Sequence, residues 1–178
     1  MGSTLFSKRF DQNKEKRIHY ISALTLLNAQ DGESSNYSYL DLVILIKEYS
    51  SDPNLDLLEL YKRMIFNIIT SNTDDHLRNH GFIISEDFKI RLSPLFDLNQ
   101  VKNSYTHTLN IFSDMKEINL DNLINYSKYF NLSKDEGKKI IEEINMTIKD
   151  SLNTLFKIYS FNRFEKEYIH SSLKYIEN

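Results

Sequence analysis

An apolar helical stripe that ends abruptly in a polar segment is the feature of this 178-residue sequence that most constrains its fold. Asp52-Pro53 places a helix-capping acid before a proline, and proline is favoured at the first helical position. Apolar residues then recur at helical spacing, at Leu57, Leu60, Tyr61, Met64, Ile65 and Ile68. The spacing predicts a central helix that presents residues 72–79 as a loop on a rigid platform.

The remaining pattern predicts a mainly α protein. Ser38 and the capping box Ser133-Lys134-Asp135-Glu136 each mark the start of a helix, and the second helix is expected to reach about residue 159. Further helices are expected over 23–27, 120–130 and 162–176, and two short strands over 81–84 and 89–92. The last helix is predicted to close the bundle with Phe164, Tyr168, Leu173 and Tyr175.

Length and composition predict one globular domain. A chain of this length falls within the usual single-domain range, so residues 1–178 are expected to form one domain, with 1–6 a tag or a disordered segment. The sequence has no cysteine, which excludes disulfides and Cys-based zinc sites and suits a reducing cytoplasm. The net charge of −3 argues against direct nucleic-acid binding, and no apolar run is long enough for a membrane span.

The polar segment carries the chemistry. Asp74 and Asn79 stand five residues apart, which is the Asp-x4-Asn spacing of a protein-kinase catalytic loop. In such a loop the Asp takes the proton of the substrate hydroxyl and the Asn binds magnesium. The two predicted strands then lead to Asp97, where a second metal-binding acid is expected after a hairpin. Together these three residues indicate Mg-dependent phosphoryl transfer, whereas Asp74 alone would be interpreted as bracing a turn.

The two histidines and the arginine of this segment allow other interpretations of its chemistry. His76 and His80 have the spacing of a zinc-binding pair on a helix. The general-base Glu of that motif is missing, because Leu77 takes its place, and the segment is predicted to be a loop. Arg78 has two interpretations of equal weight, a contact with a phosphate or substrate and an ordinary surface charge.

A family resemblance rests on four separated stretches in a fixed order. These are Ser7-Lys8-Arg9-Phe10-Asp11, Ser38-Tyr39-Leu40-Asp41-Leu42, Asn72 to Gly81 and Leu92 to Asn99. They resemble the C-terminal region of HipA-type toxin kinases, which are bacterial serine/threonine kinases of toxin–antitoxin modules. The resemblance implies a protein-kinase-like C-lobe, a helical bundle with a short β-hairpin next to the catalytic loop.

The same resemblance implies roles for the site residues. Asp74 would be the catalytic base, and Asn79 and Asp97 would bind ATP through the Mg that they hold. His76 would support the loop by hydrogen bonding, with Arg78 beside it, and Asp75 is given no chemical role.

The sequence has too few glycines for a phosphate-binding loop, which limits the kinase activity expected of this chain alone. Its four glycines, Gly2, Gly32, Gly81 and Gly137, cannot form a glycine-rich phosphate loop. In the resembled family the Arg-Phe-Asp motif follows the connection between the two kinase lobes, and here it begins at residue 9. The chain is therefore expected to be a C-lobe that needs an N-lobe from a separate polypeptide or another part of the gene.

The sequence supports two functional hypotheses. In the first, the chain is the catalytic lobe of a cytoplasmic serine/threonine protein kinase. Its partners would be an N-lobe polypeptide, an antitoxin and a protein substrate, and any DNA contact would come through the antitoxin. In the alternative, the chain is a non-catalytic C-lobe relic that acts as a binding and regulatory module for an antitoxin or a kinase.

Overall fold

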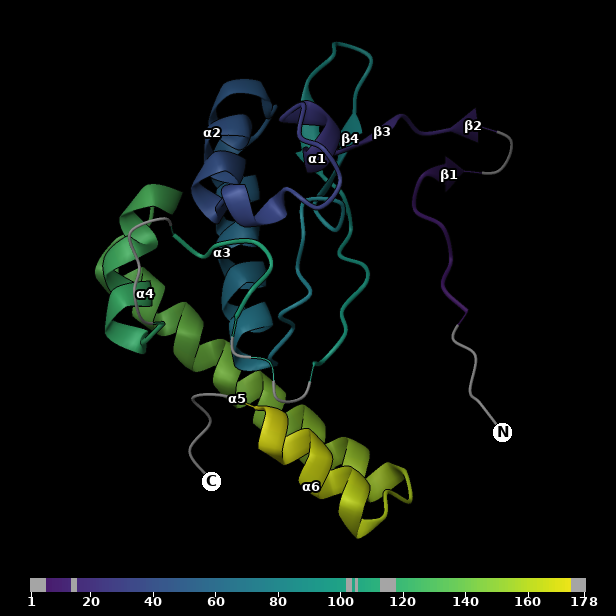
Figure 1. Cartoon of the computed structure of the whole chain (residues 1–178), viewed down its shortest axis with the longest axis vertical. Helices are drawn as coiled ribbons and strands as arrows, with labels where there is room; N and C mark the ends of the chain where they lie inside the picture. The colour runs from purple at the N-terminus through teal and green to yellow at the C-terminus, as the bar shows by residue number, and fades with distance from the viewer. Residues whose placement is uncertain (1–5, 14–15, 102–103, 105, 113–117, 174–178) are drawn as a thin grey trace.

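The computed structural model of the chain describes residues 6–13, 16–101, 104, 106–112 and 118–173. Two adjacent helices, α2 (Tyr39–Tyr49) and α3 (Pro53–Ile69), stand at its centre, and the long α5 (Lys134–Ile158) crosses α3 (Figure 1). The shorter helical elements are α1 (Ala23–Leu26), η1 (Ser34–Asn36), α4 (Leu120–Tyr126), η2 (Ser127–Phe130) and α6 (Arg163–Ser172). The predicted mainly α fold is therefore confirmed.

The central helix forms as the sequence predicts. The Asp52 side chain accepts a hydrogen bond from the Leu55 N–H (3.2 Å), and Pro53 occupies the first turn of α3. All six residues of the predicted stripe are fully buried. The helix packs against α2, α5 and η2, so its burial on several sides makes it a rigid platform for the polar segment at its C-terminal end.

A small antiparallel sheet lies beside the helices. The predicted hairpin is present as β4 (Gly81–Ile84) and β5 (Ile90–Leu92), and β3 (Tyr20–Ser22) adds a third strand on the outer side of β4. A separate two-stranded ribbon of β1 (Gln12–Asn13) and β2 (Lys16–Arg17) stands away from the helices (Figure 1). The third strand adds to the predicted hairpin, because the sequence predicts strands only over 81–84 and 89–92.

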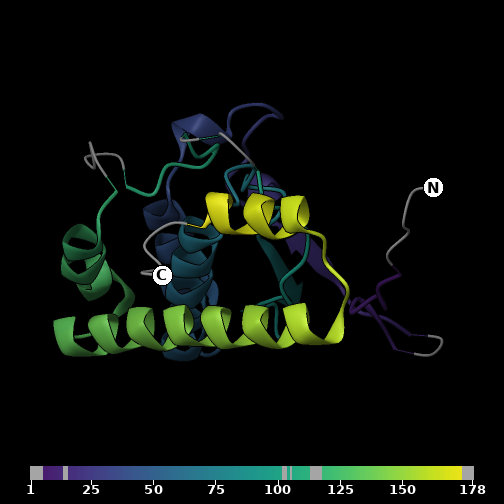
Figure 2. The same ribbon diagram turned by 90° about the horizontal axis from the view of Figure 1, so that it is seen from below.

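The last helix departs from the prediction. Viewed from below, α6 lies opposite the C-terminal half of α5 (Figure 2). Phe164 and Tyr168 are 81% and 41% exposed, so the expectation that they close the bundle is wrong. The side of the helix that carries the partly buried Ile169 and the buried Ser172 turns inward instead, and the partly buried Leu173 follows it. Helical spacing alone could not tell which of these two faces would be covered.

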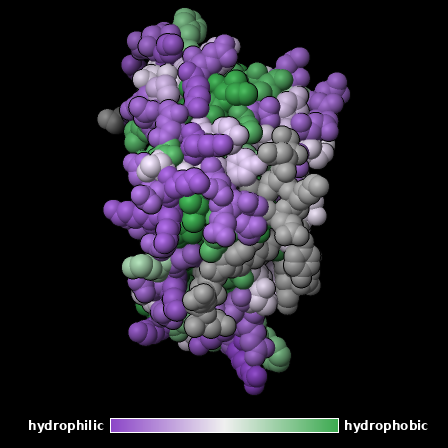
Figure 3. Space-filling model, turned by 90° about the vertical axis from the view of Figure 1, so that its left-hand side faces the viewer, coloured by the Kyte–Doolittle hydropathy of each residue, from purple (hydrophilic) through white to green (hydrophobic). Residues whose placement is uncertain are grey.

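Two predictions fall at the ends of the chain, where the structure cannot test them. Residues 1–5, which carry most of the expected tag or disordered segment, and the expected packing residue Tyr175 lie outside the described residues. One face of the molecule is mostly hydrophilic, with separate apolar patches (Figure 3). Within the described ranges, no helix combines the length and the apolar character that crossing a membrane requires.

The stripe on α3 makes a direct stability prediction. Leu60→Ala should lower the free energy of unfolding by about 2–5 kcal/mol, because it removes fully buried methyl groups from the core. Leu55→Ala, on the same helix but at a side chain that is 51% exposed, is the matched control and should change it by less than about 1 kcal/mol. Urea unfolding measures both, and equal losses would contradict the placement of the helix.

Candidate active site

The polar segment after α3 has no regular secondary structure, yet hydrogen bonds fix it on two sides. The carbonyl groups of Thr73 and Asp75 accept from the N–H groups of Thr108 and Leu109, both at 2.9 Å. On the other side, the carbonyl of His80 accepts from the first residue of α1 at 2.7 Å. The segment is therefore held as a defined loop.

A second loop runs beside the first and is tied to it at both ends. After β5, the N–H of Ser93 donates to the carbonyl of Gly81 (2.9 Å). At the far end, the N–H of Val101 donates to the carbonyl of Ser71 (3.0 Å). These two hydrogen bonds thus join the ends of the first loop, residues 72–80, to the ends of the second loop, residues 94–100.

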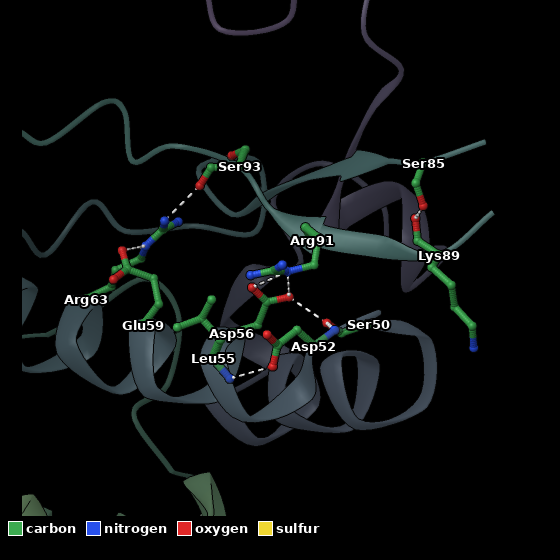
Figure 4. Close-up of polar contacts among 10 residues, drawn as sticks. All are labelled: Ser50, Asp52, Leu55, Asp56, Glu59, Arg63, Ser85, Lys89, Arg91 and Ser93. Atoms are coloured by element: carbon green, nitrogen blue, oxygen red, sulfur yellow. Dashed lines mark hydrogen bonds and ion pairs between the residues drawn. The ribbon is translucent and has the colours of Figure 1, made fainter. Parts of the chain in front are cut away.

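Figure 4 shows how α3 holds the start of this second loop. The Asp56 carboxylate, which is buried, accepts from the Nε of Arg91 on β5 at 3.0 and 3.1 Å and from Ser50 Oγ at 2.6 Å. Further along α3, the buried Arg63 donates from Nη2 to the carbonyl of Ser93 (2.7 Å). Charge-assisted contacts of this kind fix the strand and the first residue of the loop relative to the central helix.

The three residues predicted to carry the chemistry lie on these two loops. The Asp74 side chain is exposed, whereas Asn79 is buried and its Nδ2 lies 3.4 Å from the carbonyl oxygen of Asp74 as a donor. Asp97 is exposed, has a positive φ of 57°, and accepts from Nδ2 of Asn99 at 2.7 Å. The arrangement offers two exposed carboxylates and an amide on adjoining loops.

The donor types at Asn79 and Asp97 suit magnesium. Mg²⁺ prefers carboxylate and amide oxygens, and it usually takes one or two protein ligands and fills its other positions with water and phosphate oxygens. Within the described ranges, no three His, Cys, Asp or Glu side chains gather closely enough to hold a metal ion. Asn79 and Asp97 therefore supply donor types that could hold a magnesium ion together with phosphate oxygens.

The two residues assigned a supporting role contact each other. The Nη2 of Arg78 lies 3.1 Å from Nε2 of His76, and the same guanidinium pairs with Asp31. The side chains of Arg78 and Asp31 are 48% and 74% exposed, so this ion pair contributes about 0–1 kcal/mol. In this structure Arg78 thus joins the loop of residues 72–80 to the loop that follows α1.

Asp75 is the residue that sequence reasoning undervalued. Its carboxylate is buried, accepts a hydrogen bond from the hydroxyl of Tyr39, and has Nε2 of His80 3.0 Å from Oδ1. Asn67 on α3 donates to the same Tyr39 hydroxyl (3.1 Å), and Asn72 donates to Asn67 (3.1 Å). This buried polar network joins α2, α3 and the loop that carries Asp74.

A signal for this network is present in the sequence. Tyr39 and Asn67 occupy inward-facing positions of two predicted helices, where an apolar residue would be the simpler choice. Buried polar side chains need partners, so they point to polar residues in the adjoining loop.

The electrostatics of the network depend on its partners. Burial acts to raise the pKa of the Asp75 carboxyl, but the charge of His80 and the hydrogen bonds from His80 and Tyr39 outweigh it and lower the pKa. Burial and the charge of Asp75 raise the pKa of Tyr39 well above its usual value. Tyr39 is therefore neutral, and its hydroxyl donates a hydrogen bond to the Asp75 carboxylate.

An aromatic cluster reaches the residue before Asp97. The ring of Phe96 lies 5.8 Å from that of Phe10 and 6.3 Å from that of Tyr20. The Tyr20 ring covers Gly81 so closely that a Cβ added there would lie 2.2 Å from its Cε2 atom. A side chain at position 81 would therefore have to displace the Tyr20 ring, which packs on Phe96.

Comparison with known proteins agrees with this fold. The chain is similar to HipA from Shewanella oneidensis MR-1, whose solved structure is a complex with HipB and operator DNA. The match covers 92% of this chain and 44% of the HipA chain, with a TM-score of 0.72 and 14% sequence identity. This likeness shows a shared fold. A model of the family described as the HipA-like C-terminal domain matches residues 2–152. The chain therefore belongs to the HipA-like C-terminal domain family, and the resemblance seen in its motifs is confirmed.

A curated relative adds a kinase to this comparison. The protein named "Putative kinase Y4dM" from Sinorhizobium fredii (strain NBRC 101917 / NGR234) is 27% identical over 100 residues, covering 54% of this chain and 24% of its own length. The chain thus spans about a quarter of this relative and less than half of the solved HipA chain. These matches support a kinase-related role within the HipA family.

The buried network predicts a pH-dependent stability effect. Asp75→Asn should lower the free energy of unfolding by about 2–4 kcal/mol at neutral pH, because it leaves His80 and Tyr39 without their charged partner. The pKa of Asp75 is lowered by folding, so its contribution is present above the unfolded pKa of about 4 and is lost as pH falls through the folded pKa. The two proteins should converge in acid.

Urea unfolding between neutral and acidic pH measures this difference. Asp74→Asn is the matched control, because its exposed carboxylate should contribute less than about 1 kcal/mol. A difference between Asp75→Asn and the original protein that stays constant across the pH range would contradict the assigned role of the carboxylate.

The contact between Gly81 and Tyr20 predicts a coupled effect. Gly81→Ala should lower the free energy of unfolding by about 1–3 kcal/mol, because the new methyl group overlaps the Tyr20 ring. In a Tyr20→Ala background the same change should cost clearly less, since the ring is gone. A double-mutant cycle from urea unfolding measures the coupling, and strictly additive losses would show that the ring does not cover Gly81.

Proposed function

We propose that this chain is the catalytic lobe of a HipA-like serine/threonine protein kinase that transfers the γ-phosphate of ATP to a protein hydroxyl. The observation that carries the proposal is the pair of hydrogen bonds, Ser93 to Gly81 and Val101 to Ser71, which joins the two loops bearing Asp74, Asn79 and Asp97. Membership of the family and similarity to a kinase-named relative support it.

Each residue has one task in this proposal. The exposed carboxylate of Asp74 accepts the proton of the substrate hydroxyl as its oxygen attacks the phosphorus. Asn79 and Asp97 would hold Mg²⁺, which would supply positive charge to the phosphate oxygens. The network around Asp75 fixes the loop on which Asp74 and Asn79 stand, and such positioning supplies much of the catalysis in phosphoryl transfer.

We further propose that activity requires an N-lobe that this sequence does not supply. No glycine-rich loop can be formed from its four glycines, so the phosphates need a cover from elsewhere. An antitoxin is the proposed regulatory partner, because the similar HipA structure is a complex with HipB and operator DNA. In this proposal the kinase acts in the cytoplasm on a protein substrate and contacts DNA only through the antitoxin.

Kinase assays on the chain combined with an N-lobe polypeptide test the proposal. Asp74→Ala, Asn79→Ala and Asp97→Ala should each lower kcat by at least about 100-fold, because each removes a group that acts on the reacting atoms. Asp87→Ala, which removes an exposed carboxylate from the β4–β5 turn, is the control of equal charge change and should leave kcat unchanged. Transfer of labelled phosphate from ATP to protein is the measurement.

The same variants separate the enzyme from a non-catalytic binding module. A module would keep its effect on an antitoxin or kinase partner after Asp74→Ala combined with Asp97→Ala, whereas the effect of an enzyme would disappear. Retention of the full effect in the double variant would overturn the proposed activity.

A further inference from the structure

A cavity of about 390 Å³ lies behind the Asp97 loop, between the end of α3, α5 and α6. Its walls are mainly apolar and come from Phe66, Leu98, Ile148, Leu152, Ile169 and Leu173. Side-chain amides and hydroxyls supply the rest, and none of the described side chains that line it is charged. A volume of a few hundred Å³ with apolar walls and a few polar groups is typical of a small-molecule site.

The cavity shares its walls with the candidate active site. Leu98 and Asn99, which line it, come directly after Asp97, and Nδ2 of Asn99 donates to the Asp97 carboxylate (2.7 Å). Gln100, also in the wall, donates from Nε2 to the carbonyl of Ile169 on α6 (3.4 Å). A molecule seated in the cavity would therefore contact the segment that positions Asp97.

The helix that closes the cavity is hydrogen-bonded to the site loops near its C-terminal end. The hydroxyl of Ser71, at the start of the catalytic-loop segment, donates to the carbonyl of Ser172 in the last turn of α6. At the other end of the helix, Phe164 is 81% exposed. The same helix thus covers the cavity and is bonded to both site loops, through Ser71 and through Gln100.

One polar group in the wall specifies part of the ligand. Asn72 is 3% exposed, and its Nδ2 donates to Asn67. Its Oδ1 has no hydrogen-bond partner among the described residues, although a buried acceptor ordinarily has one. A ligand that carries an N–H or O–H donor would supply that partner once the Asn72 side chain turns its buried Oδ1 toward the cavity.

We propose that this cavity binds a small, uncharged and largely apolar molecule with one hydrogen-bond donor, and that its binding shifts the Asp97 segment. The apolar walls and the lack of lining charge exclude a nucleotide or another anion as the preferred ligand. The binding itself is independent of the proposed kinase function, whereas its regulatory meaning rests on that function through Asp97.

Binding is tested on the full chain with N-phenyl-1-naphthylamine, an uncharged apolar dye that carries one N–H group and fluoresces more strongly in apolar surroundings. The dye should bind saturably with one site per chain. Ser151→Trp, which adds a ring at an exposed helical position in the cavity wall, should weaken binding by at least about tenfold by filling the space.

Asn153→Trp is the matched control, because it adds the same ring to the same helix at an exposed position outside the cavity wall. It should bind the dye as the original protein does. Equal binding by the original protein and Ser151→Trp, or no saturable binding at all, would overturn the proposed site.

Amide NMR tests whether binding in the cavity shifts the Asp97 segment. In amide NMR spectra, the dye should shift the signals of Asp97, Leu98 and Asn99 in the original protein and leave them unchanged in Ser151→Trp. If the dye binds without these shifts, the proposed coupling is wrong but the proposed binding site stands. The dye could also shift these signals in a protein that does not bind Mg-ATP, even with an N-lobe. That result would overturn the kinase proposal, while the cavity and its coupling to the Asp97 segment would stand.

Discussion

Burial of the apolar stripe on α3 is the constraint on which the rest of the structure depends. Its six stripe residues are fully buried against α2, α5 and η2, which fixes the axis and rotation of the helix. That orientation has two consequences for the site. Arg63 and Asp56 face the β4–β5 hairpin and anchor Ser93 and Arg91. The C-terminal end of the helix leads directly into the loop of residues 72–80. The hydrophobic packing of one helix thus positions both loops of the site.

The loop itself is stabilised by a buried charge with several partners. Burying a carboxylate is unfavourable unless charges and hydrogen bonds compensate it, and Asp75 has both in His80 and Tyr39. Because these partners come from another helix and from the far end of the loop, they restrict the positions that Asp74 and Asn79 can take. Asp74, next to the buried Asp75, keeps its own carboxylate exposed to solvent. Asp75 thus has a structural role in the loop, and the adjacent Asp74 is the acid that we propose acts on the substrate.

The sequence predicted those elements whose signals are local. The caps at Ser38, Asp52 and Ser133 and the helical periodicity after each of them depend on residues close together in the chain, and all three helices form as expected. The Asp-x4-Asn spacing and the hairpin were likewise visible, since they lie within one short stretch. The structure places the loops carrying Asp74, Asn79 and Asp97 side by side, while their assigned chemistry stays a prediction.

The features that the sequence could not predict depend on contacts between distant segments. The pairing of β3 with β4, the packing of Tyr20 over Gly81, and the bond from Tyr39 to Asp75 each join residues far apart in the chain. The inward face of α6 was misjudged for the same reason, because Phe164 and Ile169 are both apolar and only the position of α5 decides between them.

The most direct test of the central claim is whether the two tied loops share one metal–nucleotide site. Mn²⁺ in place of Mg²⁺, with a non-hydrolysable ATP analogue, broadens amide NMR signals near the bound metal. The account predicts that signals of residues 74–79 and 97–99 broaden together, and that Asp97→Ala abolishes the effect on both loops. Broadening confined to one loop, or to exposed acids elsewhere such as Asp87, would contradict it.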